Sequence, residues 1–434
     1  MNTIARVARI MQTVLLDIAD QIARETKFVR RERKLSGSSF LQTLVLSCLQ
    51  NPAVSYTDMT QSAAVVGVEI SGPGLLYRFT REAVLFLQRM LEYAVQQVIA
   101  SRPAAVPILE RFRGVHLRDS SVIGLPVALA ETWPGVGGSQ GTTAALKLQV
   151  ELDFRSGQLH GPVLQSGRTQ DQQSPYQQRQ LPAGALHIAD LGYFNLTKLA
   201  EDDDRGVYWI TRLKAGTAVY TEAGERIDLL PWLRAQPQAQ GDHPVLIGTR
   251  TRIPCRLLVV RVPQEVAEQR RRRLRDYARK KQVPLKAETL ALTEWTLLIT
   301  NVPVEMLSLP EALVLSRVRW QVELLFKLWK SCLLVDEWRS ENPWRILCEI
   351  YAKLIAVVIV HWLSLVSIWE CPDRSLTKAA QAVGKFAVAL ALRLHDRAEL
   401  VNVLTHLQMC LRATCKMNRR RKHPNTYQLL LEPA

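Results

Sequence analysis

Apolar residues recur at helical spacing over roughly the first hundred residues. In one stretch they fall at Val14, Leu15, Ile18 and Ile22, which are neighbouring positions on one face of an amphipathic helix. The pattern continues to about Ile99, so we expect a helical N-terminal domain over residues 1–105.

Within this domain, two helices are separated by a glycine. A short helix should begin near Ser55 and end at Val65, Gly67 should form a turn, and a second helix should run from Leu75 to about Ile99. This outline is typical of a helix-turn-helix. In that interpretation Arg78 and Arg81 enter a DNA groove, whereas an ordinary helical hairpin is the alternative.

From Gly114 the apolar pattern changes to short runs typical of strands. Gly114–Asp119 and Ala185–Asp190 each read as a strand that ends in an acid, and Ala144–Phe154 and Gln158–Val163 read as two further strands. Strands followed by helices predict a mixed α/β sheet. Ligands gather at the carboxyl ends of strands in such sheets, which makes Asp119 and Asp190 candidate site residues.

The remaining pattern predicts a β-rich segment, a last strand and several helices. Strand-like runs fall within residues 207–295 and again at 295–302, and helices are expected over 310–332, 346–369 and 375–411. The acidic triplet at 202–204 reads as a solvated loop. Leu354–Trp369 is an apolar run of 16 residues, short of the ~20 needed to span a membrane, so we expect a buried core helix.

Composition narrows the class of partner. The 434 residues are 47% hydrophobic and 22% charged, and 56 Lys plus Arg exceed 40 Asp plus Glu to give a net charge of +16. This excess favours a nucleic acid or an anionic membrane surface as partner. The basic run Arg270–Lys281 is either a solvated helix face or a phosphate-contacting one. Seven cysteines without a C-x-x-C pair suggest reduced thiols and a cytoplasmic location.

A third candidate acid lies on the helix expected over 310–332. Ser316, Arg319, Glu323 and Lys330 follow one another at intervals of 3, 4 and 7 residues, which places them on one helical face. An amphipathic surface helix with an Arg–Glu pair one turn apart is the plainer interpretation of this pattern.

The order of several motifs resembles the DDE transposases of bacterial insertion sequences, in the subgroup with a Tyr-Arg-Glu-Lys signature. The matching segments are Asp119-Ser120-Ser121, Asp190-Leu191-Gly192-Tyr193-Phe194, Trp295-Thr296-Leu297-Leu298-Ile299-Thr300-Asn301, Arg319 with Glu323 and Lys330, and Asn418-Arg419-Arg420-Arg421-Lys422. One position departs from the signature, because Ser316 stands where the subgroup has Tyr.

The resemblance implies a ribonuclease-H-like catalytic core over residues 106–206 and 296–345, with Asp119, Asp190 and Glu323 as the catalytic and metal-binding triad. Glu323 follows Asp190 by 133 positions, a separation too long for a loop. A β-rich insertion domain over 207–295 and a helical C-terminal region over 346–434 complete the expected organisation.

Three carboxylates suit two Mg²⁺ or Mn²⁺ ions, and no two of the eight His have a zinc-site spacing. The resemblance further implies that DNA is held by Arg319, Lys330, Ser316, Trp295 and Trp320, of which Trp295 would stack on a base flipped out near the transposon end.

The activity implied is cut-and-paste transposition. A strand is hydrolysed at the transposon end, and the freed 3′-hydroxyl then joins target DNA. The implied partners are double-stranded DNA, as inverted-repeat ends and as target, and a second copy of the chain in a homodimer; no membrane is expected. Two alternatives remain open at this stage: a metal-dependent nuclease on the same fold, or a decayed copy that only binds DNA.

Overall fold

A computed structural model of the chain describes residues 3–31, 34–137, 142–422 and 424–432. The residues form two compact units, which we consider separately. The first unit comprises Met1–Val106, Asp119–Thr169 and Trp320–Gln428, and the second comprises Pro107–Arg118, Gln170–Arg319 and Leu429–Ala434.

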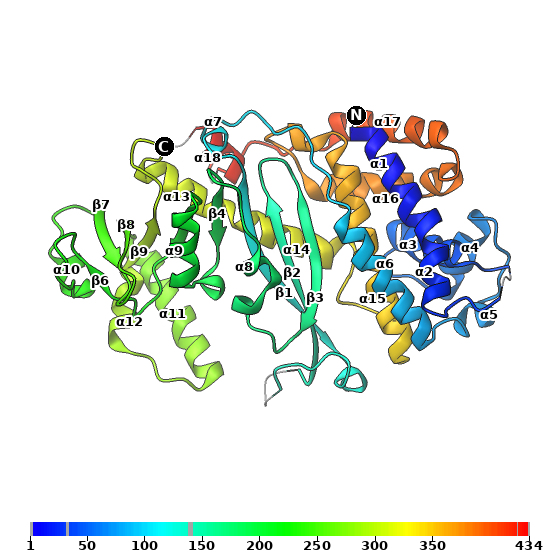
Figure 1. Cartoon of the computed structure of the whole chain (residues 1–434), viewed down its shortest axis with the longest axis horizontal. Coiled ribbons are helices and arrows are strands. Elements are labelled where there is room, and N and C mark those ends of the chain that lie inside the picture. Colours follow the sequence, from blue (N-terminus) through cyan, green and yellow to red (C-terminus); the bar gives the residue numbers. More distant parts are fainter. Residues whose placement is uncertain (1–2, 32–33, 138–141, 423, 433–434) are drawn as a thin grey trace. The chain divides into compact units, whose positions relative to one another are not determined.

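Helices from both ends of the chain build most of the first unit (Figure 1). Helix α15 packs against α3, α6 and α16, and α1 packs against α17. A π-helical turn at Thr13–Asp17 joins α1 to α2. The helices that lie in this unit are α1 (Thr3–Gln12), α2 (Ile18–Glu25), α3 (Gly37–Gln50), α4 (Tyr56–Val65), α5 (Gly72–Leu76), α6 (Arg81–Gln96), α14 (Trp320–Cys332), α15 (Pro343–Leu365), α16 (Leu376–Arg393) and α17 (Arg397–Thr414).

Helix α15 is the core helix predicted from its apolar run. By length and composition it is apolar enough to cross a membrane, but its apolar stretch is entirely buried inside the structure. The buried ammonium of Lys353 lies 2.9 Å from the Glu349 carboxylate one turn earlier and also donates to two main-chain carbonyls. These bonds are what allow a charged side chain to sit in an apolar helix.

Strands supply the rest of the first unit. Strand β2 (Ala144–Asp153) pairs antiparallel with β3 (Leu159–Ser166), and the strand order β3-β2-β1 continues to β1 (Val115–Leu125). The two strands are joined by a turn at Ser156-Gly157, where Gly157 takes a positive φ of 74° that other residues adopt only with strain.

The second unit is a mixed sheet flanked by helices, and β1 enters it through residues Val115 to Arg118. The strand order is β1-β4-β5-β9-β8-β7-β6; β1, β4 and β5 run parallel, and the pairs from β5 onward are antiparallel. The α/β class is therefore confirmed. The elements are α7 (Pro107–Glu110), α8 (Pro175–Gln178), β4 (Leu186–Ala189), α9 (Leu196–Asp204), β5 (Tyr208–Arg212), β6 (Val219–Tyr220), α10 (Leu229–Arg234), β7 (Gln240–Ile247), β8 (Ile253–Arg261), α11 (Gln264–Lys281), α12 (Ala287–Ala291), β9 (Trp295–Thr300) and α13 (Leu309–Val318), with α18 (Thr426–Leu431) at the chain end.

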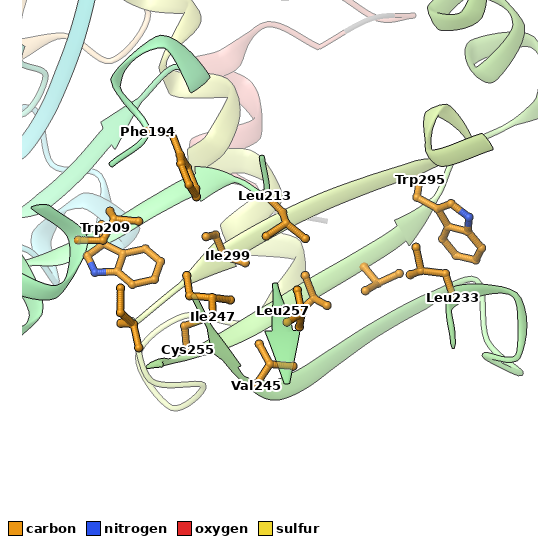
Figure 2. Packing of buried hydrophobic residues seen from close by; sticks show 14 residues of the cluster. Phe194, Trp209, Leu213, Leu233, Val245, Ile247, Cys255, Leu257, Trp295 and Ile299 are labelled. Carbon is orange, nitrogen blue, oxygen red and sulfur yellow. The ribbon is translucent and has the colours of Figure 1, made fainter. Parts of the chain in front are cut away.

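The apolar core of the second unit lies along β5 and β7–β9. Figure 2 shows Trp209 and Trp295 at opposite ends of this cluster, with Ile247, Leu257 and Ile299 between them. Alternating apolar positions on antiparallel strands bring these side chains to one face of the sheet.

Three predicted helices are interrupted in the structure. The helix expected over 75–99 is divided into α5 and α6, because the Thr80 hydroxyl accepts the Ala83 amide at 3.3 Å and starts a new helix. The helix expected over 375–411 is divided into α16 and α17, because the Asp396 carboxylate accepts the amides of Ala398 and Glu399 at 2.8 and 3.0 Å. The helix expected over 310–332 is divided into α13 and α14 at Arg319.

Candidate active site

Asp119 lies inside strand β1 and not at its end, which corrects the expectation from the sequence. The strand continues for six residues to Leu125, because the run after Asp119 still alternates and pairs in the sheet. In the second unit β1 pairs parallel with β4, and Arg118 is aligned with Ala189. Asp119 and Asp190 are the next residues along these two strands.

A buried arginine fixes the chain just before Asp119. Arg118 has no solvent exposure, and its guanidinium donates to Gln177 Oε1 at 3.3 Å and to the Arg179 carbonyl at 3.4 Å. On the other side of Asp119, the Ser120 amide donates to Asp119 Oδ1 at 2.8 Å. These bonds restrain both the main chain and one carboxylate oxygen of this acid.

Asp190 directly follows β4 and precedes a 3₁₀ turn at Leu191–Tyr193. The turn is held from α8, because Gln177 Nε2 donates to the Tyr193 carbonyl at 2.8 Å. Within this unit the Asp190 Oδ1 atom lies 3.8 Å from Arg319 Nε; the Asp190 side chain is 44% exposed and that of Arg319 is 12% exposed. The structure thus brings together two of the predicted site residues, an acid and the arginine of the signature.

The acidic triplet after this loop is not a solvated loop, as the sequence had suggested. It forms the end of α9, and Asp202 is 1% exposed beside His187, Lys198 and Arg205. Burial by itself raises the pKa of Asp202, but its interactions with His187 and Lys198 outweigh burial and lower the pKa to about 2. Asp202 therefore anchors α9 to the strand that leads to Asp190.

The remaining signature residues are divided between two helices. Ser316 lies on α13, where its hydroxyl donates to the Leu313 carbonyl at 2.8 Å, while Glu323 and Lys330 lie on α14. Lys330 Nζ donates to the Val122 carbonyl of β1 at 3.1 Å and lies 3.9 Å from Asp336 Oδ2. Trp320 is 46% exposed, and Lys327 lies over its ring at 5.9 Å. One continuous helix face does not carry the motif.

Trp295 belongs to the core and also lines a cavity. It is 6% exposed and lies at one end of the core cluster (Figure 2). Its indole N–H is buried without a hydrogen-bond partner among the described residues. The cavity has a volume of about 760 Å³, and Arg212, Lys214, Arg226 and Arg270 contribute the cations that line it.

The predicted DNA-binding arginines of the N-terminal region lie around the start of α6. Arg81 is exposed and is the first residue of α6, and Arg78 is half-buried before it. Arg78 lines a hollow of about 410 Å³ in the first unit, together with Lys27, Arg30, Arg31 and Glu82. Arg30 lies 3.7 Å from Glu82.

Sequence reasoning missed three kinds of site residue. No pattern in the sequence pointed to the buried Arg118 beside Asp119, although the apolar residues on both sides of it indicate a buried position. Arg212 is the last residue of β5 and Lys214 follows that strand, and neither was singled out. Lys27, Arg30 and Arg31 received no role from the sequence, and only the fold places them beside Arg78.

In the part of the chain that the structure describes, no three His, Cys, Asp or Glu side chains are gathered into a metal site. Asp119 and Glu323 belong to the first unit, and Asp190 belongs to the second. The chemistry of this donor set nevertheless fits a hard divalent cation, since all three side chains are carboxylates.

A family model described as "Transposase DDE domain" matches residues 111–359. The chain belongs to the DDE transposase family. The match begins just before β1 and ends within α15, so it contains Asp119, Asp190 and Glu323. Members of this family depend in general on divalent metal ions, and they act on DNA.

Named relatives agree with this assignment over most of the transposase. The chain is 29% identical over 377 residues to the transposase for insertion sequence element IS231F of Bacillus thuringiensis subsp. israelensis, covering 81% of this chain and 78% of that protein. It is 23% identical over 368 residues to the transposase for element IS1151 of Clostridium perfringens, covering 78% and 76%. The putative transposase InsL for IS186A of Escherichia coli is 31% identical over 178 residues, covering 39% and 45%.

The protein is therefore a transposase of the insertion-sequence type, an enzyme that cuts and joins DNA. The composition already favoured an anionic partner, and the family identifies that partner as DNA.

Proposed function

We propose that this transposase cuts and joins DNA at a site formed by Asp119, Asp190 and Glu323, which hold two Mg²⁺ or Mn²⁺ ions. The observation that carries the proposal is the parallel pairing of β1 with β4, aligned up to Arg118 and Ala189. The two aspartates are the next residues on these strands.

Two contacts support the inclusion of Glu323. Arg319, which lies 3.8 Å from Asp190, precedes Glu323 by one helical turn of sequence. Lys330 contacts β1 at Val122. This bond ties α14, the helix that carries Glu323, to β1, the strand that carries Asp119.

Asp119, Asp190 and Glu323 would hold these ions, which would supply an activated water and a stabilised leaving oxygen for an in-line displacement. The protein side chains position the substrate. Arg319 offers a planar two-pronged donor to a phosphate, and Lys330 offers a point charge. Catalysis of this kind rests on positioning and charge neutralisation.

Trp295 and its cavity are proposed to receive a base displaced from the duplex near the transposon end. Support comes from the indole N–H, which is buried without a partner among the described residues, and from the cations that line the cavity. Arg78, Arg81 and Trp320 are proposed to contact DNA because each lies at or near the surface. Ser316 is also proposed to contact DNA, through its short hydroxyl side chain.

The finer classification is also a proposal. The core would be ribonuclease-H-like over residues 106–206 and 296–345, with the insertion domain at 207–295, the DNA-binding domain at 1–105 and the helical region at 346–434. The spacing of Arg319, Glu323 and Lys330 favours the Tyr-Arg-Glu-Lys subgroup despite Ser316. The chain would act as a homodimer on two paired ends in the nucleoid of the cytoplasm.

The decisive experiment compares three single variants, Asp119→Asn, Asp190→Asn and Glu323→Gln, with the wild type on a duplex taken from the DNA that flanks the gene. Each variant should bind that duplex but lose strand cleavage and most Mn²⁺ binding by calorimetry. The matched control is Asp204→Asn, which removes one charge from an exposed acid at the end of α9. Variants that keep both cleavage and Mn²⁺ binding would exclude the triad.

A second assay separates transposition from hydrolysis alone. Precut ends with a free 3′-hydroxyl are supplied with plasmid target DNA, and joined product is measured. We expect joining by the wild type and by Asp204→Asn. Cleavage without any joining would leave a nuclease, and binding without cleavage would leave a decayed copy.

A further inference from the structure

Helix α11 (Gln264–Lys281) carries the strongest concentration of positive charge in the second unit. Its inward face is formed by residues that recur at helical spacing. Ala267 and Ala278 are buried, and Arg270, Arg271 and Leu274 are half-buried between them. Intervals of 3, 4 and 7 residues put all five on one side of a helix. The basic run is therefore divided by the helix into an inward and an outward set.

The two inward arginines tether α11 to the start of β9. Arg270 donates to the Trp295 carbonyl at 3.0 Å and to the Thr296 hydroxyl at 2.9 Å. Arg271 pairs with Glu294. Because Arg270 and Trp295 both line the 760 Å³ cavity, the helix is fixed at the wall of that cavity.

The outward set is exposed to solvent. It comprises Arg272, Arg273, Arg275, Arg279 and Lys280. Arg279 is 80% exposed and lies 3.1 Å from Asp276, whereas Arg272, Arg273 and Arg275 form no ion pair among the described residues. The helix also carries three acids, Glu265, Glu268 and Asp276, of which Glu265 and Glu268 line a hollow together with Arg272. The five outward cations outnumber these acids, and Arg270 and Arg271 hold the helix in place, so this face is a fixed surface of positive potential.

We propose that the outward face of α11 binds the sugar–phosphate backbone of duplex DNA beside the Trp295 cavity. The cations from Arg272 to Lys280 extend over about 12 Å of helix, a length that spans roughly three phosphates of one strand at ~3.4 Å of axis each. The contact is to the backbone, so it is independent of base sequence.

A membrane surface fits this helix less well. A helix that lies on a lipid bilayer needs a broad apolar face opposite its charges. The face of α11 opposite its outward cations packs on the protein through Ala267 and Ala278. Along the whole described helix, the large apolar side chains that are exposed are Val266 and Tyr277. The charges thus point outward without an apolar stripe to insert.

The inference rests on the proposed function only in taking DNA as the ligand. Its test uses the full-length chain and a mixed-sequence duplex, and measures the affinity over a range of salt concentrations. The variant Arg272→Gln/Arg275→Gln/Arg279→Gln removes one flank of the outward face. Each lost phosphate contact reduces the log–log salt slope by ~0.9, so we expect the slope to fall by about 2 to 3.

The matched control is Arg234→Gln/Arg250→Gln/Lys286→Gln, which removes three exposed cations elsewhere in the same unit. We expect its slope to stay within about 0.9 of the wild type. Equal slopes in the wild type and the α11 variant, or an equal fall in the control, would overturn the inference. So would loss of binding to phosphatidylserine vesicles in the α11 variant with DNA binding unchanged.

A stability readout separates surface from structural roles. The α11 triple variant should keep the wild-type melting temperature, whereas Arg270→Gln should lower it, because Arg270 is a tether. A failure of the proposed active site would be seen differently: the wild type would bind the duplex with its full salt slope but cleave nothing.

Discussion

At the scale of single residues, Asp190 and Arg319 show how two residues from separate sequence motifs come into contact. In sequence they are 129 positions apart, and in the structure their side chains lie 3.8 Å apart. The guanidinium balances the charge of an acid proposed to bind metal. Binding of a divalent cation and binding of this arginine to Asp190 therefore oppose each other.

Arg319→Ala should consequently bind Mn²⁺ more tightly and DNA more weakly. The Arg319 charge lies about 4 Å from the acid and repels a cation that binds there. Removing it relieves a repulsion of a few kcal/mol at an effective dielectric near 20, although solvent screens much of this energy. We therefore expect roughly a three- to tenfold gain in Mn²⁺ affinity. Isothermal titration measures it, with Arg319→Lys as the control that keeps the charge. Equal Mn²⁺ affinity in the alanine and lysine variants would contradict this interpretation.

Ser316 is the residue at which the chain departs from the Tyr-Arg-Glu-Lys signature. Its hydroxyl already donates to the Leu313 carbonyl of its own helix. A side chain engaged in this way is an ordinary helical serine. The structure thus gives a local reason for the serine, and no reason that concerns the DNA.

At the scale of elements, the helix boundaries are set by single capping side chains. Thr80 and Asp396 each begin a new helix within a run that the apolar pattern alone treats as continuous. Helix α15 illustrates the opposite case, because a long apolar run leaves only one favourable outcome, burial in a core.

Burial of His361 within α15 predicts a measurable pH dependence. Burial lowers the pKa of His361 to about 4, although its hydrogen bond to the Gly157 carbonyl, at 2.7 Å, raises it. As the pH falls from about 6.5 to 4, the unfolded chain takes up a proton that the folded chain does not, so folding loses stability. The loss is about 3 kcal/mol over that interval.

The change to test is His361→Gln, which retains a donor but does not titrate. The free energy of unfolding of this variant should depend less on pH between 6.5 and 4 than that of the wild type, as measured by denaturant unfolding at several pH values. His406→Gln, at an exposed histidine of α17, should follow the wild type. A His361→Gln curve parallel to the wild type would mean that this histidine titrates normally.

At the scale of the whole molecule, a net charge of +16 suits a protein that binds long DNA and displaces the cations condensed on the phosphates. The charge is concentrated in places: around Arg78 in the first unit, and along α11 and the Trp295 cavity in the second. Each place lies beside a residue proposed to contact DNA.

Pairing of two transposon ends predicts a defined stoichiometry. With Ca²⁺ in place of Mg²⁺ to support binding without cleavage, the wild type and a duplex bearing one end should form a complex of two chains and two duplexes. Mass photometry measures the mass, and a mixed-sequence duplex is the control. A complex of one chain on one duplex would contradict the proposed homodimer.

The sequence by itself determined the class of the molecule and the identity of its chemistry. Local periodicity decides helix or strand. It predicted helices near both ends, an α/β centre and a core helix over 346–369, which the structure places at Pro343–Leu365. The ordered motifs Asp119, Asp190 and Glu323 identified the family, because they depend on residue type and order and not on packing.

Tertiary structure alone decided which side of an element faces a partner. The basic run at 270–281 is uniform in sequence, yet Arg270 and Arg271 turn inward while Arg272 and Arg279 turn outward. The burial of Asp202 and of Trp295 is likewise decided by the tertiary structure. Periodicity fixes the relative positions of side chains around one element, whereas burial depends on residues brought together from distant parts of the chain.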